Sequence, residues 1–402
     1  MTSSGYNQVE HLRLPHDPDS RRSRSSRPFM QQDSAGTTPL QLLGVLACLV
    51  AYGLVVVYSA VQGNETYSFT RQLTGIGIGA VLMLIISHMD YRQLAGYTTL
   101  LLIVNVVLIL SPHLPVIGVE SHGARSWINL GMRLQPGEFA KITVILLDAG
   151  LIARYGAQLD DFREYLKVLG IMAVPFLCIM TQPDLGTGLV YLFIDAVALV
   201  MGGARLRHLL ITLAAFIALI AAVFALDEVL KGATGQYHLL KDYQRSRLFV
   251  FMNQGEDSSD SGYNLKQAMI AVGSGGFLGK GFGNATQSSL GFVPEAPTDF
   301  IFCVLAEQFG FVGAVALLGL YLALVILSIR IARNAADLHG TLIVACIVGM
   351  WLFQILENVG MNIGLMPITG IPLPFMSYGT SFMLVNFMLV GLIWSVYARR
   401  GA

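Results

Sequence analysis

Charged side chains are scarce in this chain. Of its 402 residues, 12% are Asp, Glu, Lys or Arg, whereas 54% are hydrophobic; an average soluble domain has about 25% charged residues. So few charges would leave much of the surface of a soluble fold of this length uncovered, which argues against a soluble protein. Lys plus Arg and Asp plus Glu both number 25, so the net charge gives no indication of a nucleic-acid partner.

Cysteine is also scarce. The four residues present are Cys48, Cys178, Cys303 and Cys346. Each lies within an apolar run, and their spacing matches neither a metal site nor a disulfide framework. We therefore expect them to be small, buried apolar side chains. The chain also lacks an internal repeat strong enough to indicate an inverted-repeat transporter.

The apolar residues are gathered in runs of about 20, the length of a helix that crosses the hydrocarbon layer of a membrane. The predicted fold is an all-α polytopic membrane protein with about ten transmembrane helices. The predicted spans are 39–61, 70–88, 93–111, 137–154, 165–182, 184–202, 207–229, 300–329, 339–361 and 376–398. The polar, Ser/Arg/Pro-rich residues 1–38 predict a disordered cytoplasmic tail, and residues 39–400 form the transmembrane domain.

Lys and Arg are concentrated in alternate connections between the predicted spans, which places both termini on the cytoplasmic side of the inner membrane. Arg125 and Arg133 are exceptions in a short outer loop. The long connection at 230–299, between predicted helices seven and eight, then lies on the outer face of the membrane. A loop of this length is usually either functional or disordered, and its amphipathic stretches, aromatic residues and glycine cluster favour function.

Two polar regions lie where predicted helices begin on the outer face. In the first, Glu138 and Lys141 are three residues apart and therefore share one face of a helix that starts near Pro136. Charges at the end of a membrane helix are costly unless they are paired or hydrated. They form either a structural ion pair or the polar wall of a cavity. In the second region, Pro183 ends one span and Asp184 is positioned to cap the next.

The long loop contains a glycine cluster at 271–281. Gly279 and Lys280 suggest a phosphate-binding loop, but Ser274 stands where the first glycine of that motif would be. Lys280 is also followed by Gly281 rather than by Ser or Thr. We expect these glycines to let the backbone approach a bulky ligand or pack closely.

Asp299 is the strongest candidate for a catalytic residue. It lies where the long loop enters a predicted span and is followed directly by Phe300 and Ile301. Apolar neighbours raise the pKa of a carboxylate, which suits a general base. The alternative is an N-terminal helix cap. Glu307, two turns further along, is either core-facing or a second polar contact.

Other polar residues lie inside predicted spans or at membrane depth. They include Asp148, Asp195, Glu357, Asn358 and Asn362. Such residues face the interior of a helix bundle, and alone they fit helix packing, a proton path or a transporter equally well. The last outer loop, 364–380, has three prolines and three glycines, which predicts irregular backbone buried in protein or lining a cavity.

Six motifs, in order and spacing, resemble the SEDS family, whose members include RodA and FtsW. The resemblance covers roughly residues 40–400, and the glycine cluster and residues 370–374 are more similar to RodA than to FtsW. The motifs are Arg-Ser-Trp-Ile at 125–128, residues 135–141, Gln-Pro-Asp-Leu-Gly-Thr at 182–187, residues 273–281, Thr-Asp-Phe-Ile-Phe at 298–302, and Pro-Leu-Pro at 372–374 with Ser-Tyr-Gly at 377–379.

The resemblance implies a peptidoglycan glycosyltransferase that polymerises lipid II into β-1,4-linked glycan strands on the outer face of the membrane. The family's essential aspartate corresponds to Asp299, which would deprotonate the acceptor's 4-hydroxyl in an inverting transfer. The pyrophosphate leaving group needs positive charge, from basic side chains or from a divalent cation, Mg or Mn, for which the sequence gives no ligands. The predicted substrate-binding residues are Arg125, Glu138, Lys141, Asp184, Arg245, Lys280, Gln287, Glu295, Thr298 and Ser377.

Three positions depart from the family pattern. Gly137 replaces a common Ser, Pro297 replaces the common His before Thr-Asp, and Thr380 replaces a second Gly after Ser-Tyr-Gly. Pro297 is expected to stiffen the approach to Asp299, and it removes an auxiliary imidazole but not the aspartate.

Two other functions fit parts of the sequence. A lipid II flippase would need polar groups at the midplane, and Asp148 and Asp195 fit that requirement. A non-catalytic scaffold would not need the dense polar motifs of the outer face. The resemblance also implies membrane lipids and a class B penicillin-binding protein, which cross-links the strands, as partners.

Overall fold

The computed structural model describes residues 37–62, 66–114, 118–121, 124–129, 133–182, 184–235, 237 and 260–401. The chain divides into Met1–Thr37 and Thr38–Ala402, and the fold reported is that of the second unit. Nearly all of the predicted disordered tail therefore lies outside the described residues.

A helix occurs in each of the ranges predicted as spans. The helices are α1 (Thr37–Ala60), α2 (Phe69–His88), α3 (Thr98–Leu110), α4 (Pro136–Ala153), α5 (Phe162–Met180), α6 (Leu185–Met201), α7 (Leu206–Thr234), α11 (Ile301–Arg333), α12 (Leu338–Asn362) and α13 (Thr380–Ala398). Among the described residues, α1, α2, α7, α11, α12 and α13 are long and apolar enough to cross a membrane. A shorter apolar stretch covers Thr98–His113, and α6 is another.

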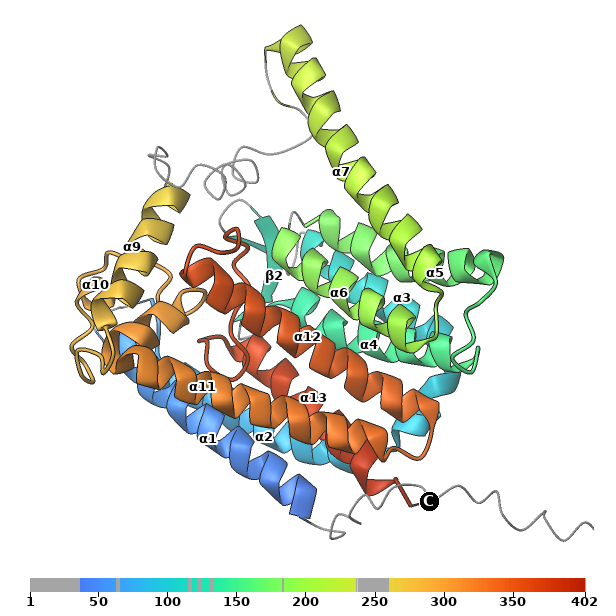
Figure 1. Ribbon diagram of the computed structural model, residues 1–402, viewed down its shortest axis with the longest axis horizontal. Helices are drawn as coiled ribbons and strands as arrows, with labels where there is room; N and C mark the ends of the chain where they lie inside the picture. Colours follow the sequence, from blue (N-terminus) through green and yellow to red (C-terminus); the bar gives the residue numbers. More distant parts are fainter. Residues whose placement is uncertain are drawn as a thin grey trace, which may run out of the picture. The chain divides into compact units, whose positions relative to one another are not determined.

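Helices α12 and α13 form the centre of the bundle. In their most apolar stretches, 72% and 78% of residues are buried inside the protein, whereas none is buried in α7. Helix α12 packs on α4 and α6 on one side and on α11 on the other, and α13 packs along α2 (Figure 1). The polar residues of α12 are therefore held in the protein interior, and α7 presents an apolar surface suited to lipid.

The structure corrects several sequence-based expectations. The third predicted span starts late, at Thr98, because Asp90 accepts a hydrogen bond from Arg92 N and caps a 3₁₀ turn, η2 (Tyr91–Gly96). Cys48 is exposed rather than buried. A small antiparallel sheet, which was not predicted, occupies the connection before α4, after the 3₁₀ turn η3. Its strands are β1 (Gly118–Ser121), β2 (Ala124–Asn129) and β3 (Arg133–Leu134), in the order β1-β2-β3. The turn η3 spans Ser111–His113.

The long loop begins later than predicted, because α7 continues to Thr234, and it contains α9 (Asp260–Gly275) and α10 (Thr286–Ser289). Its glycine cluster packs against a break in α11. At the break, Gly310 has φ 63° and ψ −159°, a conformation that favours glycine. The freed carbonyls of Glu307 and Gln308 accept from Lys280 N (2.9 Å) and Gly281 N (3.0 Å). A side chain at Gly279 would collide with the α11 backbone, so these glycines serve close packing.

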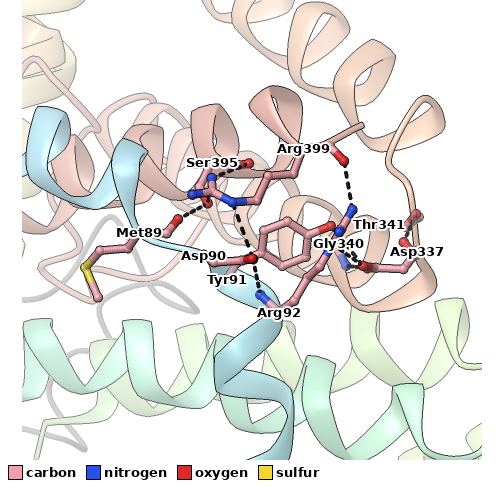
Figure 2. A network of polar contacts seen from close by, with 9 residues as sticks. All are labelled: Met89, Asp90, Tyr91, Arg92, Asp337, Gly340, Thr341, Ser395 and Arg399. Atoms are coloured by element: carbon pink, nitrogen blue, oxygen red, sulfur yellow. Dashed lines mark hydrogen bonds and ion pairs between the residues drawn. The ribbon is translucent and has the colours of Figure 1, made fainter. Parts of the chain in front are cut away.

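A polar network joins the end of α2, the start of α12 and the end of α13 (Figure 2). Arg399 donates to His88 O (2.7 Å) at the end of α2 and to Ser395 O (3.2 Å) in α13. Asp337 caps α12 by accepting from Gly340 N (2.7 Å) and pairs with Arg92 (3.2 Å). The network fixes α2, α12 and α13 relative to one another.

Replacing Arg399 by Ala is expected to lower the melting temperature by roughly 3–6 °C, because charged hydrogen bonds to several helix-end groups are lost. Arg400→Ala is the matched control, since the Arg400 guanidinium stays local: it donates to Tyr397 O (3.0 Å) in the last turn of α13 and lies over the Tyr397 ring. Thermal unfolding of the purified proteins gives the melting temperatures of both variants. An equal decrease in melting temperature in Arg399→Ala and Arg400→Ala would show that the network adds nothing to helix packing.

Candidate active site

Asp299 lies at the start of α11, where its main chain is held by α12. Asn358 Nδ2 donates to Asp299 O (2.8 Å) and to Ile371 O (2.8 Å). Asn362, one turn further along α12, also donates to Asp299 O (3.3 Å) and accepts from Cys303 N (3.2 Å). The residue at the N-cap position of α11 is Phe300, so Asp299 lies one residue before the cap.

The residues around Asp299 form one hydrogen-bonded unit. Ser377 Oγ donates to Thr298 O (2.6 Å), and Tyr378 N donates to Pro297 O (2.8 Å). The Glu295 carboxylate accepts from Thr298 Oγ1 (3.1 Å). The loop before α11 is thereby bonded to the irregular loop before α13, and three predicted site residues, Glu295, Thr298 and Ser377, lie together beside Asp299.

Tyr67 belongs to this unit although no sequence motif pointed to it. It lies between α1 and α2, and its hydroxyl donates to Glu295 Oε2 (2.7 Å). Burial, and then the hydrogen bond to Glu295, raise the pKa of Tyr67 well above its usual value. The phenol therefore keeps its proton and remains a donor to the Glu295 carboxylate.

A cavity of about 450 Å³, within the size range of small-molecule sites, has Pro297, two residues before Asp299, among its lining residues. Its walls come from the α1–α2 connection and from the loop that leads to Asp299. The lining residues are Ala60, Thr66, Tyr67, Ser288, Gly291, Val293, Pro294, Glu295, Ala296 and Pro297. Aromatic, carboxylate and main-chain groups in one cavity suit a polar organic ligand such as a sugar.

A second polar cluster lies at the start of α4 and α6. Lys141 Nζ and Glu138 Oε1 are 2.6 Å apart, and the two side chains are 2% and 5% exposed. Asp184 caps α6 by accepting from Thr187 N (2.9 Å), and it also accepts from Gln135 Nε2 (3.3 Å). Both structural alternatives considered for these residues, an ion pair and a helix cap, are therefore present.

A third cluster anchors the long loop to α11. Glu307 is fully buried and accepts from Lys280 Nζ (2.6 Å), Thr286 N (2.9 Å) and Gln287 N (3.1 Å). This settles the open question about Glu307, which holds the loop. Lys280 and Gln287 are brought together by the same carboxylate, and their predicted role in substrate binding stays a prediction.

The remaining predicted ligands lie elsewhere in the chain. Arg125 is in β2, but its side chain is outside the described part, as is all of Arg245. Among the described residues, no group of three or more His, Cys, Asp or Glu side chains is placed to hold a metal ion. The described residues therefore offer no fit for Mg or Mn, and the cation stays a prediction.

Replacing Asn358 by Ala is expected to lower the maximal rate of a reaction catalysed at Asp299 by about 100-fold. The change removes the donor to Ile371 O and leaves Asp299 O with the longer bond from Asn362 (3.3 Å). The Asp299 main chain is then less firmly held, and a displacement of about 1 Å is enough for such a loss. Asn386→Ala is the control, because Asn386 is equally buried and hydrogen-bonded, to Trp351 (2.8 Å). The reaction rates and melting temperatures of both variants are measured. If Asn358→Ala and Asn386→Ala are equally destabilised and have similar rates, Asn358 does not position Asp299.

Comparisons with known proteins identify the family of the chain. A family model described as "Cell cycle protein", for FtsW, RodA and SpoVE, matches residues 39–401. Stage V sporulation protein E of Bacillus subtilis is 36% identical over 375 residues, covering 90% of this chain and 98% of the relative. Peptidoglycan glycosyltransferase MrdB of Escherichia coli is 34% identical over 376 residues, covering 92% and 95%.

Solved structures show the same fold. A chain from a study of the structural coordination of polymerization and crosslinking by a peptidoglycan synthase complex has a TM-score of 0.74 and 30% identity, covering 90% of this chain and 97% of that one. The rod shape determining protein RodA of Thermus thermophilus has a TM-score of 0.65 and 28% identity, with the same coverage. The likeness therefore extends over nearly the whole membrane domain.

Proposed function

Since the chain belongs to the family of cell cycle proteins that includes FtsW, RodA and SpoVE, we propose that it is a peptidoglycan glycosyltransferase. It polymerises lipid II into β-1,4-linked strands on the outer face of the cytoplasmic membrane during cell elongation. The observation that carries the proposal is the position of Asp299. Its main chain is fixed by two asparagines, and the loop that leads to it lines a cavity of the size of a sugar.

Asp299 acts as the general base. Its carboxylate removes the proton from the acceptor's 4-hydroxyl while that oxygen attacks the anomeric carbon of the donor, and the lipid pyrophosphate leaves from the opposite face. The Tyr67–Glu295 pair forms one wall of the cavity and offers hydrogen-bonding groups to a sugar. The configuration at the donor carbon inverts, from the α-linked pyrophosphate to a β linkage.

The leaving pyrophosphate requires positive charge that is not already balanced. Lys141 and Lys280 are each 2.6 Å from a buried glutamate, so their charges are largely compensated. Arg125 and Arg245 are therefore the better candidates for this role. Arg125 and Arg245 stay predictions, because their side chains lie outside the described residues.

The partner proposed for this chain is a class B penicillin-binding protein, which cross-links the strands. The support is the likeness to a chain from a peptidoglycan synthase complex that couples polymerization with crosslinking. The apolar helix surfaces, above all α7, are proposed to face membrane lipids, with both termini in the cytoplasm.

The test is polymerisation by the purified chain, with and without its transpeptidase, of labelled lipid II in the presence of Mg or Mn. Glycan ladders on a gel are the expected result. A flippase would instead leave lipid II unpolymerised under every condition, and no ladder in any mixture would refute the proposal.

A further inference from the structure

Two aspartates that the proposed reaction does not use lie together inside the bundle. Asp148 is on α4 and Asp195 is on α6, and their exposed fractions are 0% and 6%. Each lies 10 residues beyond a residue at the start of its helix, Glu138 and Leu185, which is about 15 Å along the helix axis. The two carboxyl groups are therefore at similar depth, in the second half of each helix.

The two carboxyl groups lie close enough to interact with each other. Neither oxygen of Asp148, nor Asp195 Oδ1, accepts a hydrogen bond from any donor in the described part of the chain. Two ionised carboxylates in this position would repel each other without compensation, at a large cost in a low-dielectric interior. A proton between them would turn the repulsion into an O–H···O hydrogen bond.

The surrounding groups leave the pair without a counter-charge. On α4, Lys141 is committed to Glu138 at 2.6 Å. On α6, the Tyr191 hydroxyl donates to Gly137 O (3.0 Å). Facing α4 from α3, Asn105 donates to Ala140 O (3.0 Å) and to Thr143 (2.8 Å).

A buried thiol on α12 lies near the two aspartates. Cys346 is fully buried, is not in a disulfide, and faces both aspartates. From α5, Cys178 lies near Tyr191 of α6. A thiol is a weak donor and carries no positive charge, so the third wall of the site also lacks a cation.

We propose that Asp148 and Asp195 form a proton-binding site that joins α4 to α6 within the membrane, with a proton held between one oxygen of each. The site fixes the register of the two helices. At their ends, Gln135 of the α4 start bonds to Asp184 of the α6 start (3.3 Å). The polar cluster at the helix starts therefore depends on a contact made about 15 Å deeper in the bundle.

Infrared spectroscopy of the purified chain in lipid nanodiscs tests the proposal directly. The wild-type protein should show, at neutral pH, the C=O stretching band of a protonated carboxyl group, shifted on deuteration. The band should be absent from the Asp148→Asn/Asp195→Asn double variant. Its absence from the wild-type spectrum would overturn the proposal, and this measurement does not require any variant to fold.

Thermal unfolding supplies the second arm. The folded state retains a proton that the unfolded state loses, so stability falls as pH rises from mildly acidic to alkaline values. Over this pH range, we expect the melting temperature of the wild type to fall by roughly 5 °C more than that of Asp148→Asn. In that variant the amide N–H donates the hydrogen bond and does not titrate. Asp160→Asn, at an exposed ion pair with Arg205, should keep the wild-type slope. A wild-type melting temperature that depends on Na⁺ but not on pH would overturn the proposal in favour of a bound metal cation.

Discussion

Replacing Asp299 by Asn is expected to lower the rate of glycan polymerisation by about 10²–10⁴-fold, the usual contribution of a positioned general base. The amide has nearly the shape of the carboxylate but does not accept a proton. The Asp299 main-chain oxygen, rather than its side chain, is bonded to Asn358 and Asn362. The fold should therefore survive the change, and the melting temperature should stay within about 2 °C of wild type.

The measurement is the single-turnover rate of lipid II consumption, with lipid II binding measured separately. Asp299→Glu is the informative companion, because it keeps a carboxylate and displaces it by one methylene group. We expect it to retain part of the activity. A rate for Asp299→Asn close to that of wild type, with normal binding, would remove Asp299 from the chemical step.

Replacing only one partner of the Glu138–Lys141 pair is expected to destabilise the protein by about 3–5 kcal/mol, because an uncompensated charge remains in a buried position. Glu138→Gln and Lys141→Met should each lower the yield of folded protein. The double variant should recover most of the loss, because it leaves no charge behind. Thermal unfolding and yield after extraction from the membrane measure both effects.

The chain contains a matched control for this prediction. Lys167 and Glu164 have the same spacing of three residues and the same 2.6 Å separation, but their side chains are 66% and 39% exposed. Lys167→Met should change stability little, because an exposed ion pair is screened by solvent. Equal effects at the two pairs would contradict the account. If the folded double variant is also inactive, Glu138 and Lys141 serve the substrate as well as the fold.

The helices could be predicted from the sequence because membrane helices depend on local composition. Runs of apolar residues gave the positions of the spans, and local signals such as Pro136 and Asp184 gave correct helix starts. The start of α3 was missed because Asp90 caps a 3₁₀ turn within an otherwise apolar stretch. The small sheet was missed because its strands are short.

The contacts of the candidate site could not be predicted, because they join residues far apart in the chain. Tyr67 and Glu295 are 228 positions apart, and Asn358 lies 59 positions from Asp299. The sequence identified Asp299 through a family motif and Asn358 only as a buried polar residue. Glu307 was ambiguous for the same reason, since its partners, Lys280 and Thr286, come from a different part of the fold.

The most direct test of the central claim measures polymerisation and lipid II translocation in the same proteoliposomes, for wild type and for Asp299→Asn. The account predicts glycan ladders with wild type and none with the variant, although the variant is folded and inserted equally well. Lipid II movement that persists in Asp299→Asn, with no ladder from wild type, would contradict it and identify the chain as a transporter.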